Sequence, residues 1–189
     1  SSVVKVCELT VAATGLNEKA AQAAGLSYEK IVLSPLSHAG YYPGGKLMTM
    51  KVLYEKGSQR LLGAQIVGHE GVDKRIDVLA TAMQAGLPVT ALKDLDLAYA
   101  PPYASAKDPV NLVGFMAENL EQGVVKQFHW EDVAGLPRDG SVTLLDARTP
   151  GEYSGGCAEG FVNVPLDELR DHLGEISPGK PVYMMCQSG

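Results

Sequence analysis

The sequence predicts a two-part protein: an α+β domain built on an antiparallel sheet with helices over residues 1–122, then a partial α/β domain over residues 123–189. The first part is indicated by alternating apolar residues that return across a turn, followed by helical patterns. The second is indicated by strand patterns that alternate with a helical one, which is typical of a parallel sheet. With 46% hydrophobic and 20% charged residues, the composition is that of an ordinary globular protein.

The first half of the α+β domain is expected to alternate between strand and helix. Residues 3–12 have an extended pattern, residues 16–24 form a short helix closed by a glycine, and residues 28–36 have a second extended pattern. Residues 47–68 then predict a hairpin that turns at Gly57-Ser58. Because apolar and more polar residues alternate along both arms, one face of the sheet should be buried.

Two amphipathic helices complete this domain. The first carries an apolar stripe at helical spacing and ends at Gly86 and Pro88. The second opens with Asp108 as N-cap and Pro109 at the first helical position. The apolar positions are Val72, Ile76, Leu79, Ala80 and Met83 in the first helix and Val110, Val113, Ala117 and Leu120 in the second.

The second domain follows a change of character over residues 122–130, which we interpret as a linker. An apolar strand at 142–145, a loop at 146–150, a short strand at 161–164 and another strand at 182–185 predict a parallel α/β sheet. A helix is expected between the last two strands, with apolar positions at Leu166, Leu169, Leu173 and Ile176.

A cysteine at the end of the last strand is the first candidate for chemistry. Cys186 opens the stretch Cys-Gln-Ser-Gly, and ligands of open α/β sheets bind beyond the carboxyl ends of strands. A tight loop there can aim several backbone N–H groups at one point and stabilise a thiolate or a bound anion. The alternative is a buried cysteine that packs as a small apolar residue.

Three motifs in order resemble the rhodanese family: Leu-Asp-Ala-Arg-Thr-Pro-Gly-Glu-Tyr at 145–153, Phe-Val-Asn-Val-Pro-Leu at 161–166, and the Cys186 loop. The resemblance implies that Cys186 carries sulfane sulfur as a persulfide. The rest of the sulfur-binding loop would then be Gln187, Ser188 and Gly189. The family's Asp-x-Arg pair matches Asp146 and Arg148, which either order the loop or form a solvated or packing ion pair.

The chain departs from the rhodanese pattern in two places. Cys157 stands where the family commonly has His, and it is either a resolving thiol or a harmless replacement. The family's active loop also continues beyond Gly189 through an arginine and into a helix. We therefore expect both ends of this chain to be internal to a longer protein, and the chain alone to be inactive, a poor sulfurtransferase.

Tyrosines mark two loops of the first domain. Residues 37–44 contain Tyr41 and Tyr42, and residues 97–109 contain Tyr99 and Tyr103. Tyrosine hydroxyls in loops can donate hydrogen bonds to a thiolate or stabilise developing negative charge. They can equally anchor loops or fill a subunit interface, where tyrosine is enriched.

The first domain resembles the C-terminal domain of the pyridine-nucleotide disulfide reductases. The resemblance rests on residues 9–16, 38–44, 63–68, 71–77 and 98–109, and it looks closest to the coenzyme A disulfide reductase and persulfide reductase branch. In that branch a flavin-adjacent cysteine works with two tyrosines supplied by the partner subunit. The match implies that these are Tyr41 and Tyr99, with Tyr42 and Tyr103 as the fallback assignments.

This resemblance also implies cofactors and partners for the whole enzyme. FAD, NAD(P)H and coenzyme A would serve the parent, which would contain N-terminal FAD and NAD domains, form a homodimer through residues 1–122 and act on sulfur-containing small molecules. No Gly-x-Gly-x-x-Gly follows a strand here, so this chain alone should bind neither FAD nor NAD. Two alternatives stay open: an NADH oxidase, or a non-catalytic dimerisation module.

Composition excludes several other classes. The net charge of −6 and the lack of a strongly basic window argue against nucleic acid as a partner. No apolar run approaches the ~20 residues that span a bilayer. Three widely separated cysteines indicate a reducing compartment, so we expect a cytoplasmic protein. Neither His nor Cys has the spacing of a metal site.

Overall fold

The computed structural model describes residues 1–188, and the contacts between them divide the chain into two units. The first unit runs from Ser1 to Val125 and the second begins at Lys126. Gly189, a predicted member of the sulfur-binding loop, lies outside the described residues. Each unit is described by itself below.

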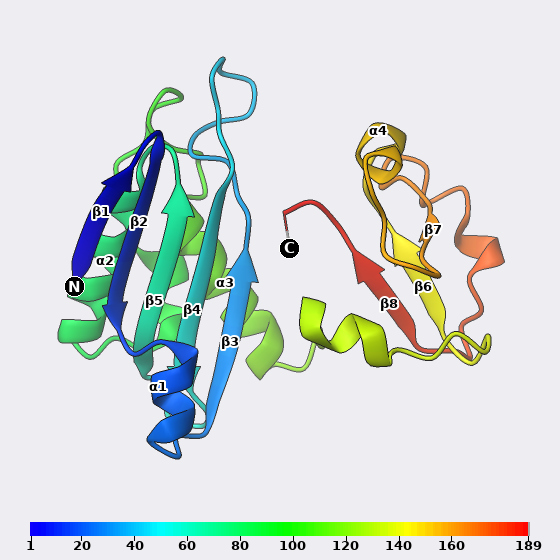
Figure 1. The fold of residues 1–189 in the computed structure, drawn as a ribbon, viewed down its shortest axis with the longest axis horizontal. Helices are drawn as coiled ribbons and strands as arrows, with labels where there is room; N and C mark the ends of the chain where they lie inside the picture. The colour runs from blue at the N-terminus through cyan, green and yellow to red at the C-terminus, as the bar shows by residue number, and fades with distance from the viewer. Residues whose placement is uncertain (189) are drawn as a thin grey trace. The chain divides into compact units, whose positions relative to one another are not determined.

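The first unit is built on a five-stranded antiparallel sheet with strand order β1-β2-β5-β4-β3 (Figure 1). Its strands are β1 (Ser2–Val6), β2 (Leu9–Gly15), β3 (Tyr28–Leu33), β4 (Met48–Glu55) and β5 (Leu61–Gly68). The predicted hairpin is confirmed by the pairing of β4 with β5. The single extended segment predicted over residues 3–12 is wrong, because it folds as a hairpin in which Cys7 turns with a φ of 54°. A Cys-Glu turn lacks the Gly, Asn or Asp that usually signals one.

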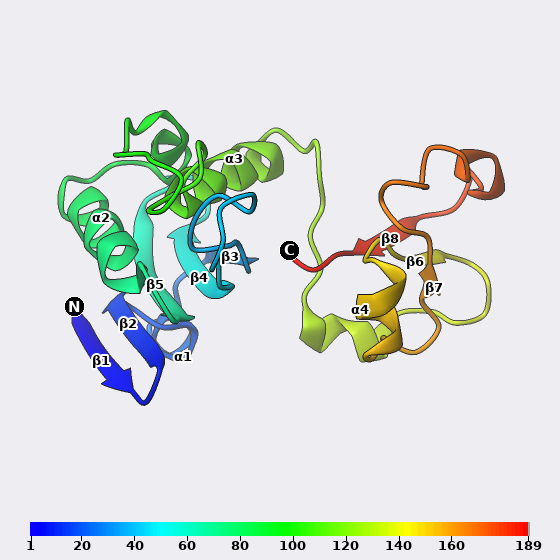
Figure 2. The same ribbon diagram turned by 90° about the horizontal axis from the view of Figure 1, so that it is seen from above.

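Two long helices cover one face of this sheet (Figure 2). They are α2 (Val72–Gln84) and α3 (Pro109–Glu121), and a 3₁₀ segment, η1 (Val89–Asp94), lies against α3. The predicted N-cap is confirmed, since the Asp108 side chain accepts a hydrogen bond from Val110 N at 3.0 Å. At Gly114 an added Cβ would lie 2.2 Å from the nitrogen of Lys93, so this glycine lets η1 approach the helix. Among the helices of residues 1–188, none combines the length and apolar character that crossing a bilayer requires.

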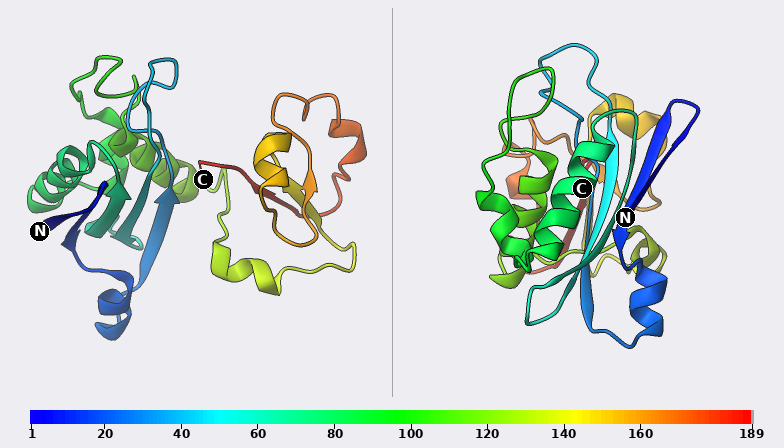
Figure 3. Two further views of the ribbon diagram at one scale, coloured as in Figure 1. Left: turned by 45° about the horizontal axis from the view of Figure 1, so that its top comes forward. Right: turned by 90° about the vertical axis from the view of Figure 1, so that its left-hand side faces the viewer.

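The opposite face of the sheet holds the short helix α1 (Glu18–Ala23), seen on the other side of the sheet from α2 in the right panel of Figure 3. Ala21 packs there on Leu53 and Leu62. Beside this contact the Glu18 carboxylate accepts hydrogen bonds from Tyr28 Oη at 3.0 Å, Lys30 Nζ at 3.0 Å and Lys51 Nζ. The hydrogen bond from Lys51 is the main reason why the pKa of Glu18 falls to about 2, while burial opposes the shift.

The second unit contains a three-stranded parallel sheet with strand order β7-β6-β8. Its elements are η2 (Trp130–Gly135), β6 (Thr143–Asp146), α4 (Pro150–Ser154), β7 (Val162–Asn163), η3 (Leu173–Glu175) and β8 (Val182–Met185). The predicted α/β class is confirmed. The short helix α4 was not predicted, although Thr149 and Glu152 cap it reciprocally.

The helix predicted around residues 166–176 is wrong. This segment consists of turns and the three-residue η3. Its apolar positions include Leu166 and Leu173, which are 67% and 57% exposed. Helical stability in proteins comes mostly from burying an apolar face. Where that face stays exposed, the periodic pattern alone does not form a helix.

We predict that Glu18→Gln lowers the free energy of unfolding at pH 7 by roughly 1–2 kcal/mol, since one pKa unit corresponds to ~1.4 kcal/mol and the carboxylate is partly screened by solvent. Because the pKa of Glu18 is lower in the folded protein than its ordinary 4.5, the contribution is present above pH 4.5 and lost as the pH falls toward about 2. Urea unfolding of both proteins from pH 3 to pH 7 measures this difference. Glu70→Gln, at an exposed carboxylate, is the matched control, and equal pH dependence of the two variants would contradict the prediction.

Candidate functional site

Two loops of the first unit bring Tyr41 and Tyr99 together. Their hydroxyl oxygens lie 2.7 Å apart, although the residues are separated by 58 positions. One loop joins β3 to β4 and the other joins η1 to α3, and Figure 1 shows both projecting from the same end of the sheet. The side chains stay open to solvent, with Tyr41 77% and Tyr99 47% exposed. The two predicted tyrosines therefore form a hydroxyl pair at the surface.

The base of both loops is held by a buried arginine that the sequence analysis missed. Arg75 of α2 is 1% exposed, and its guanidinium donates to Ser37 O at 3.0 Å and Tyr103 O at 3.3 Å. The same group donates to Asp108 Oδ2 at 3.0 Å and to Gly71 O at 3.1 Å. One side chain thus links α2, both tyrosine loops and the N-cap of α3. The available signal was the position of Arg75 on the apolar stripe of its helix, where an unpaired charge would not be tolerated.

The fallback tyrosines have different surroundings. The ring of Tyr42 packs edge-on against buried His38, with 5.6 Å between the ring centroids. Tyr103 is 73% exposed, and its backbone carbonyl is the one that Arg75 holds. A backbone hydrogen bond of 3.1 Å from Ala39 to Ala104 joins the two loops between these residues. Tyr42 and Tyr103 therefore contribute to loop structure at positions apart from the hydroxyl pair.

The hydroxyl pair is suited to donate a proton to an anion. An ordinary phenol is protonated at neutral pH, and the hydrogen bond with Tyr41 raises the pKa of Tyr99 further. Each phenol has one O–H group, and only one of the two is needed for the hydrogen bond between them. The other remains available to an acceptor in solution. A thiolate or persulfide sulfur placed above the pair is such an acceptor.

In the second unit, the ends of two adjacent parallel strands hold the predicted sulfur-site residues. Asp146 ends β6 and pairs with Met185 of β8, so Cys186 follows at the same edge of the sheet. Cys186 is exposed rather than packed in the core, and its Sγ lies 3.8 Å from the Oγ of Ser188. Gln187 lies between them and is also exposed.

The Asp146–Arg148 pair orders the loop that follows β6. Asp146 is fully buried, and its carboxylate accepts hydrogen bonds from Arg148 Nε at 3.0 Å and Nη2 at 2.7 Å. This hydrogen bonding lowers the pKa of Asp146, against the opposing effect of burial. Arg148 also donates to Gly156 O at 2.8 Å, and Asn163 Nδ2 donates to the carbonyls of both paired residues. All of these contacts join residues within the segment 146–163, which favours the interpretation that the pair orders this loop.

Cys157 lies in the same segment and directly follows Gly156, whose carbonyl accepts a hydrogen bond from Arg148. It is exposed, and a hydrogen bond with Cys157 raises the pKa of the Tyr153 hydroxyl. The hydroxyl of Tyr153 also donates to Phe161 O at 2.9 Å.

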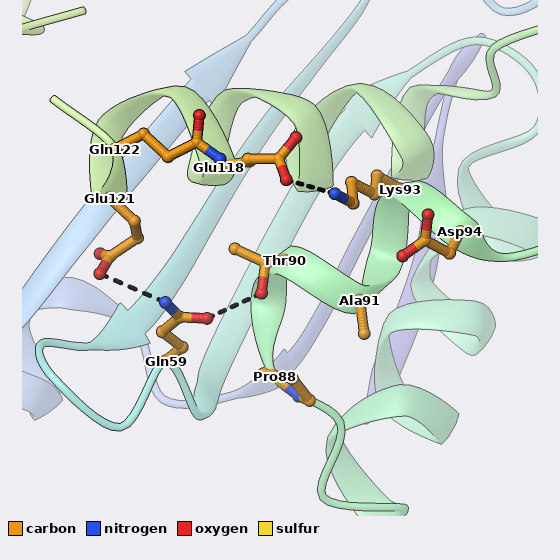
Figure 4. A pocket seen from close by; sticks show the side chains of 9 residues that line it. All are labelled: Gln59, Pro88, Thr90, Ala91, Lys93, Asp94, Glu118, Glu121 and Gln122. Carbon is orange, nitrogen blue, oxygen red and sulfur yellow. Dashed lines mark hydrogen bonds and ion pairs between the residues drawn. The ribbon is translucent and has the colours of Figure 1, made fainter. Parts of the chain in front are cut away.

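Two grooves of the first unit differ in their lining. A groove of about 480 Å³ is lined by Asp94, Glu118 and Glu121, whose charges would repel a diphosphate (Figure 4). Its polar groups also pair with one another: Gln59 donates to Glu121, Thr90 donates to Gln59, and Lys93 contacts Glu118. A second groove of about 310 Å³ between α2 and residues 87–97 is mostly apolar. Within residues 1–188, no group of three or more His, Cys, Asp or Glu side chains could hold a metal ion.

Comparison with known proteins identifies both units. Residues 1–109, more than half of the chain, match the dimerisation domain of the pyridine nucleotide-disulphide oxidoreductases. The chain belongs to this family. Residues 129–189 match the rhodanese-like domain. The predicted combination of a reductase dimerisation domain with a rhodanese-like domain is therefore confirmed.

The relatives that the chain matches are longer than the chain itself. Coenzyme A disulfide reductase of Staphylococcus haemolyticus is 39% identical over 120 residues, which cover 64% of this chain and 27% of the relative. The crystal structure of reduced Bacillus anthracis CoADR-RHD is 47% identical with a TM-score of 0.90, and the NAD-dependent persulfide reductase from A. fulgidus is 38% identical with a TM-score of 0.86. Each match to these two structures covers 98% of this chain and 33% of the other. The chain thus spans about a third of the solved structures that it resembles.

We predict that Tyr41→Phe lowers the pKa of Tyr99, because the hydrogen bond that raises it is lost. Titration of ¹³C-labelled tyrosine ring carbons by NMR measures each phenol separately. Tyr28→Phe, which removes a phenol bound to Glu18 on α1, is the matched control and should leave Tyr99 unchanged. A Tyr99 titration curve identical in wild type and Tyr41→Phe would show that the hydroxyl pair does not form in solution.

Proposed function

We propose that the chain is the C-terminal part of an FAD- and NAD(P)H-dependent reductase of coenzyme A disulfide, coenzyme A persulfide or polysulfide. In this proposal residues 1–122 form the homodimer and residues 123–189 begin the sulfur-carrying domain. FAD and NAD(P)H would be held by N-terminal domains of the parent, since no Gly-x-Gly-x-x-Gly follows a strand in this chain. A cytoplasmic location, expected from the cysteines, accords with this chemistry.

The observation that carries the proposal is the Tyr41–Tyr99 hydroxyl pair, 2.7 Å apart on exposed loops. Two phenols at a surface, on loops that a buried arginine holds, can complete a site on another subunit. Their role would be to hold a proton and donate it to the sulfur that leaves as a thiolate when a disulfide or persulfide is cleaved. The exposure of both rings leaves the hydroxyls open to such a sulfur.

Cys186 would carry sulfane sulfur to or from the reductase site. Its thiolate attacks the outer sulfur of a persulfide R–S–SH, the S–S bond breaks, and RS⁻ leaves while Cys186 becomes a persulfide. RS⁻ then takes a proton from water or from the new persulfide. The step is a sulfur transfer without net oxidation. The exposure of Cys186, and its place at the carboxyl edge of β6 and β8, support access by such a substrate.

We predict that Tyr41→Phe/Tyr99→Phe in the full-length enzyme lowers kcat for coenzyme A disulfide or persulfide reduction by roughly 10²-fold, the range of a lost general acid. The measurement is anaerobic NAD(P)H oxidation with each sulfur acceptor. Tyr42→Phe/Tyr103→Phe is the matched control and should keep near-normal turnover.

Other outcomes of this assay identify the alternatives. Unchanged turnover in Tyr41→Phe/Tyr99→Phe, together with a weakened dimer, would refute the catalytic role. Residues 1–122 would then act only as a dimerisation module. Faster turnover with oxygen than with every sulfur acceptor would make the parent an NADH oxidase.

We predict that Cys186→Ser in the full-length enzyme lowers the amount of sulfur gained from a small persulfide donor, because the carrier thiol is lost, while Cys157→Ser does not lower it; Cys7 and the flavin-adjacent cysteine of the parent are the same in both variants. Mass spectrometry of the intact protein detects the mass of each sulfur atom gained. Both residues are exposed, so the pair tests chemistry rather than access. Persulfide formation that survives Cys186→Ser but disappears in Cys157→Ser would assign the carrier role to the other thiol.

A further inference from the structure

The buried side chain of Arg75 contacts both tyrosine loops at positions equally far along the chain from Tyr41 and Tyr99. Ser37 is four residues before Tyr41, and Tyr103 is four residues after Tyr99. Arg75 Nη2 donates to both Ser37 O and Tyr103 O. One nitrogen therefore holds each loop at a carbonyl that lies four residues from the tyrosine of the hydroxyl pair.

We propose that Arg75 is a positioning residue for the reductase reaction, which sets the Tyr41–Tyr99 hydroxyl pair by holding both loops at their base. The inference rests on the proposed function for its catalytic consequence, but its structural part can be tested without it. Arg75 reaches the reacting atoms only through the loops, so it is not itself catalytic.

The loops need such an anchor because their tips are exposed. Tyr41 and Tyr103 are 77% and 73% exposed, so packing of these two rings does not fix the loop tips. The backbone contact between Ala39 and Ala104 joins the loops to each other, whereas Arg75 joins both of them to α2. Fixing the base of each loop restricts where its tip can lie.

The surroundings of Arg75 are shaped for a guanidinium. Asp108 is 2% exposed and balances the charge, and Lys74 Nζ adds a weaker contact to the same carboxylate at 3.7 Å. At Gly71, whose φ is 70°, an added Cβ would lie 1.9 Å from Arg75 Nη1, so the guanidinium would have to shift. A guanidinium has five N–H donors in a planar fork, whereas the shorter-reaching ammonium of lysine has three around a point charge. Lysine at position 75 could keep the ion pair with Asp108 but would lose the simultaneous contacts to both loops.

The first test uses this chain. In Arg75→Lys the pKa of Tyr99, measured by NMR of ¹³C-labelled tyrosine, should move down toward its value in Tyr41→Phe. Arg60→Lys, at an exposed arginine that pairs with Glu55, is the matched control and should leave Tyr99 as in wild type. Urea unfolding followed alongside reports whether the core beneath α2 remains folded. An unchanged Tyr99 titration in a folded Arg75→Lys protein would overturn the proposal.

A second variant covers the case in which Arg75→Lys does not fold. Asp108→Asn keeps an N-cap residue for α3 but removes the carboxylate that fixes the guanidinium. The pKa of Tyr99 should again move down, by less than in Tyr41→Phe. A Tyr99 titration identical to wild type in Asp108→Asn would count against the proposal in the same way.

The full-length enzyme then separates this inference from the proposed function. Arg75→Lys should lower kcat roughly tenfold or more with little change in KM, because misplaced catalytic groups are costly. In the Tyr41→Phe/Tyr99→Phe background it should cause no further loss. If Tyr99 shifts in Arg75→Lys but the tyrosine variant keeps full turnover, Arg75 sets the hydroxyl pair but the proposed function, and with it the catalytic consequence, fails. If the tyrosine variant loses turnover but Arg75→Lys changes neither Tyr99 nor kcat, the proposed function holds and the positioning role fails.

Discussion

The buried Arg75–Asp108 ion pair is the contact on which the arrangement of the first unit depends. A guanidinium that is 1% exposed is strongly unfavourable unless its charge and its N–H groups are matched. Here Asp108 balances the charge, and carbonyls from two loops and from Gly71 accept the hydrogen bonds. Because breaking one of these contacts leaves a buried donor without an acceptor, the loops, α2 and the start of α3 are fixed together. Exposed tyrosines can then occupy a defined place at the surface.

The second unit uses the same principle on a smaller scale. Asp146 is fully buried at the end of β6 and is matched by Arg148, which also holds the carbonyl of Gly156. Asn163 then ties the loop back to the neighbouring strand. The carboxylate of Asp146 thus orders the loop that follows β6, at the sheet edge where β8 ends before Cys186.

Periodic patterns predicted the elements whose apolar faces are buried in this chain. The β4–β5 hairpin, α2 and α3 follow from their sequences because each packs on the common core. The predicted helix around residues 166–176 did not form, since Leu166 and Leu173 stay exposed. The turn at Cys7 was not predicted because the sequence there has no Gly, Asn or Asp. Arg75 escaped it because its partners, Ser37 and Tyr103, lie 38 and 28 positions away, beyond any local pattern. Resemblance, not periodicity, singled out Tyr41 and Tyr99, whose proximity depends on the fold.

In the proposed mechanism, a buried cation holds two phenols where they act on sulfur bound to another subunit. A crystal structure of the full-length homodimer, reduced and soaked with a coenzyme A persulfide or disulfide, tests this most directly. We expect Tyr41 and Tyr99 of one protomer to lie within hydrogen-bond distance of the sulfur held by its partner, with Arg75 still bound to both loops. A structure in which the two phenols face bulk solvent, far from any sulfur atom of the partner subunit, would contradict it.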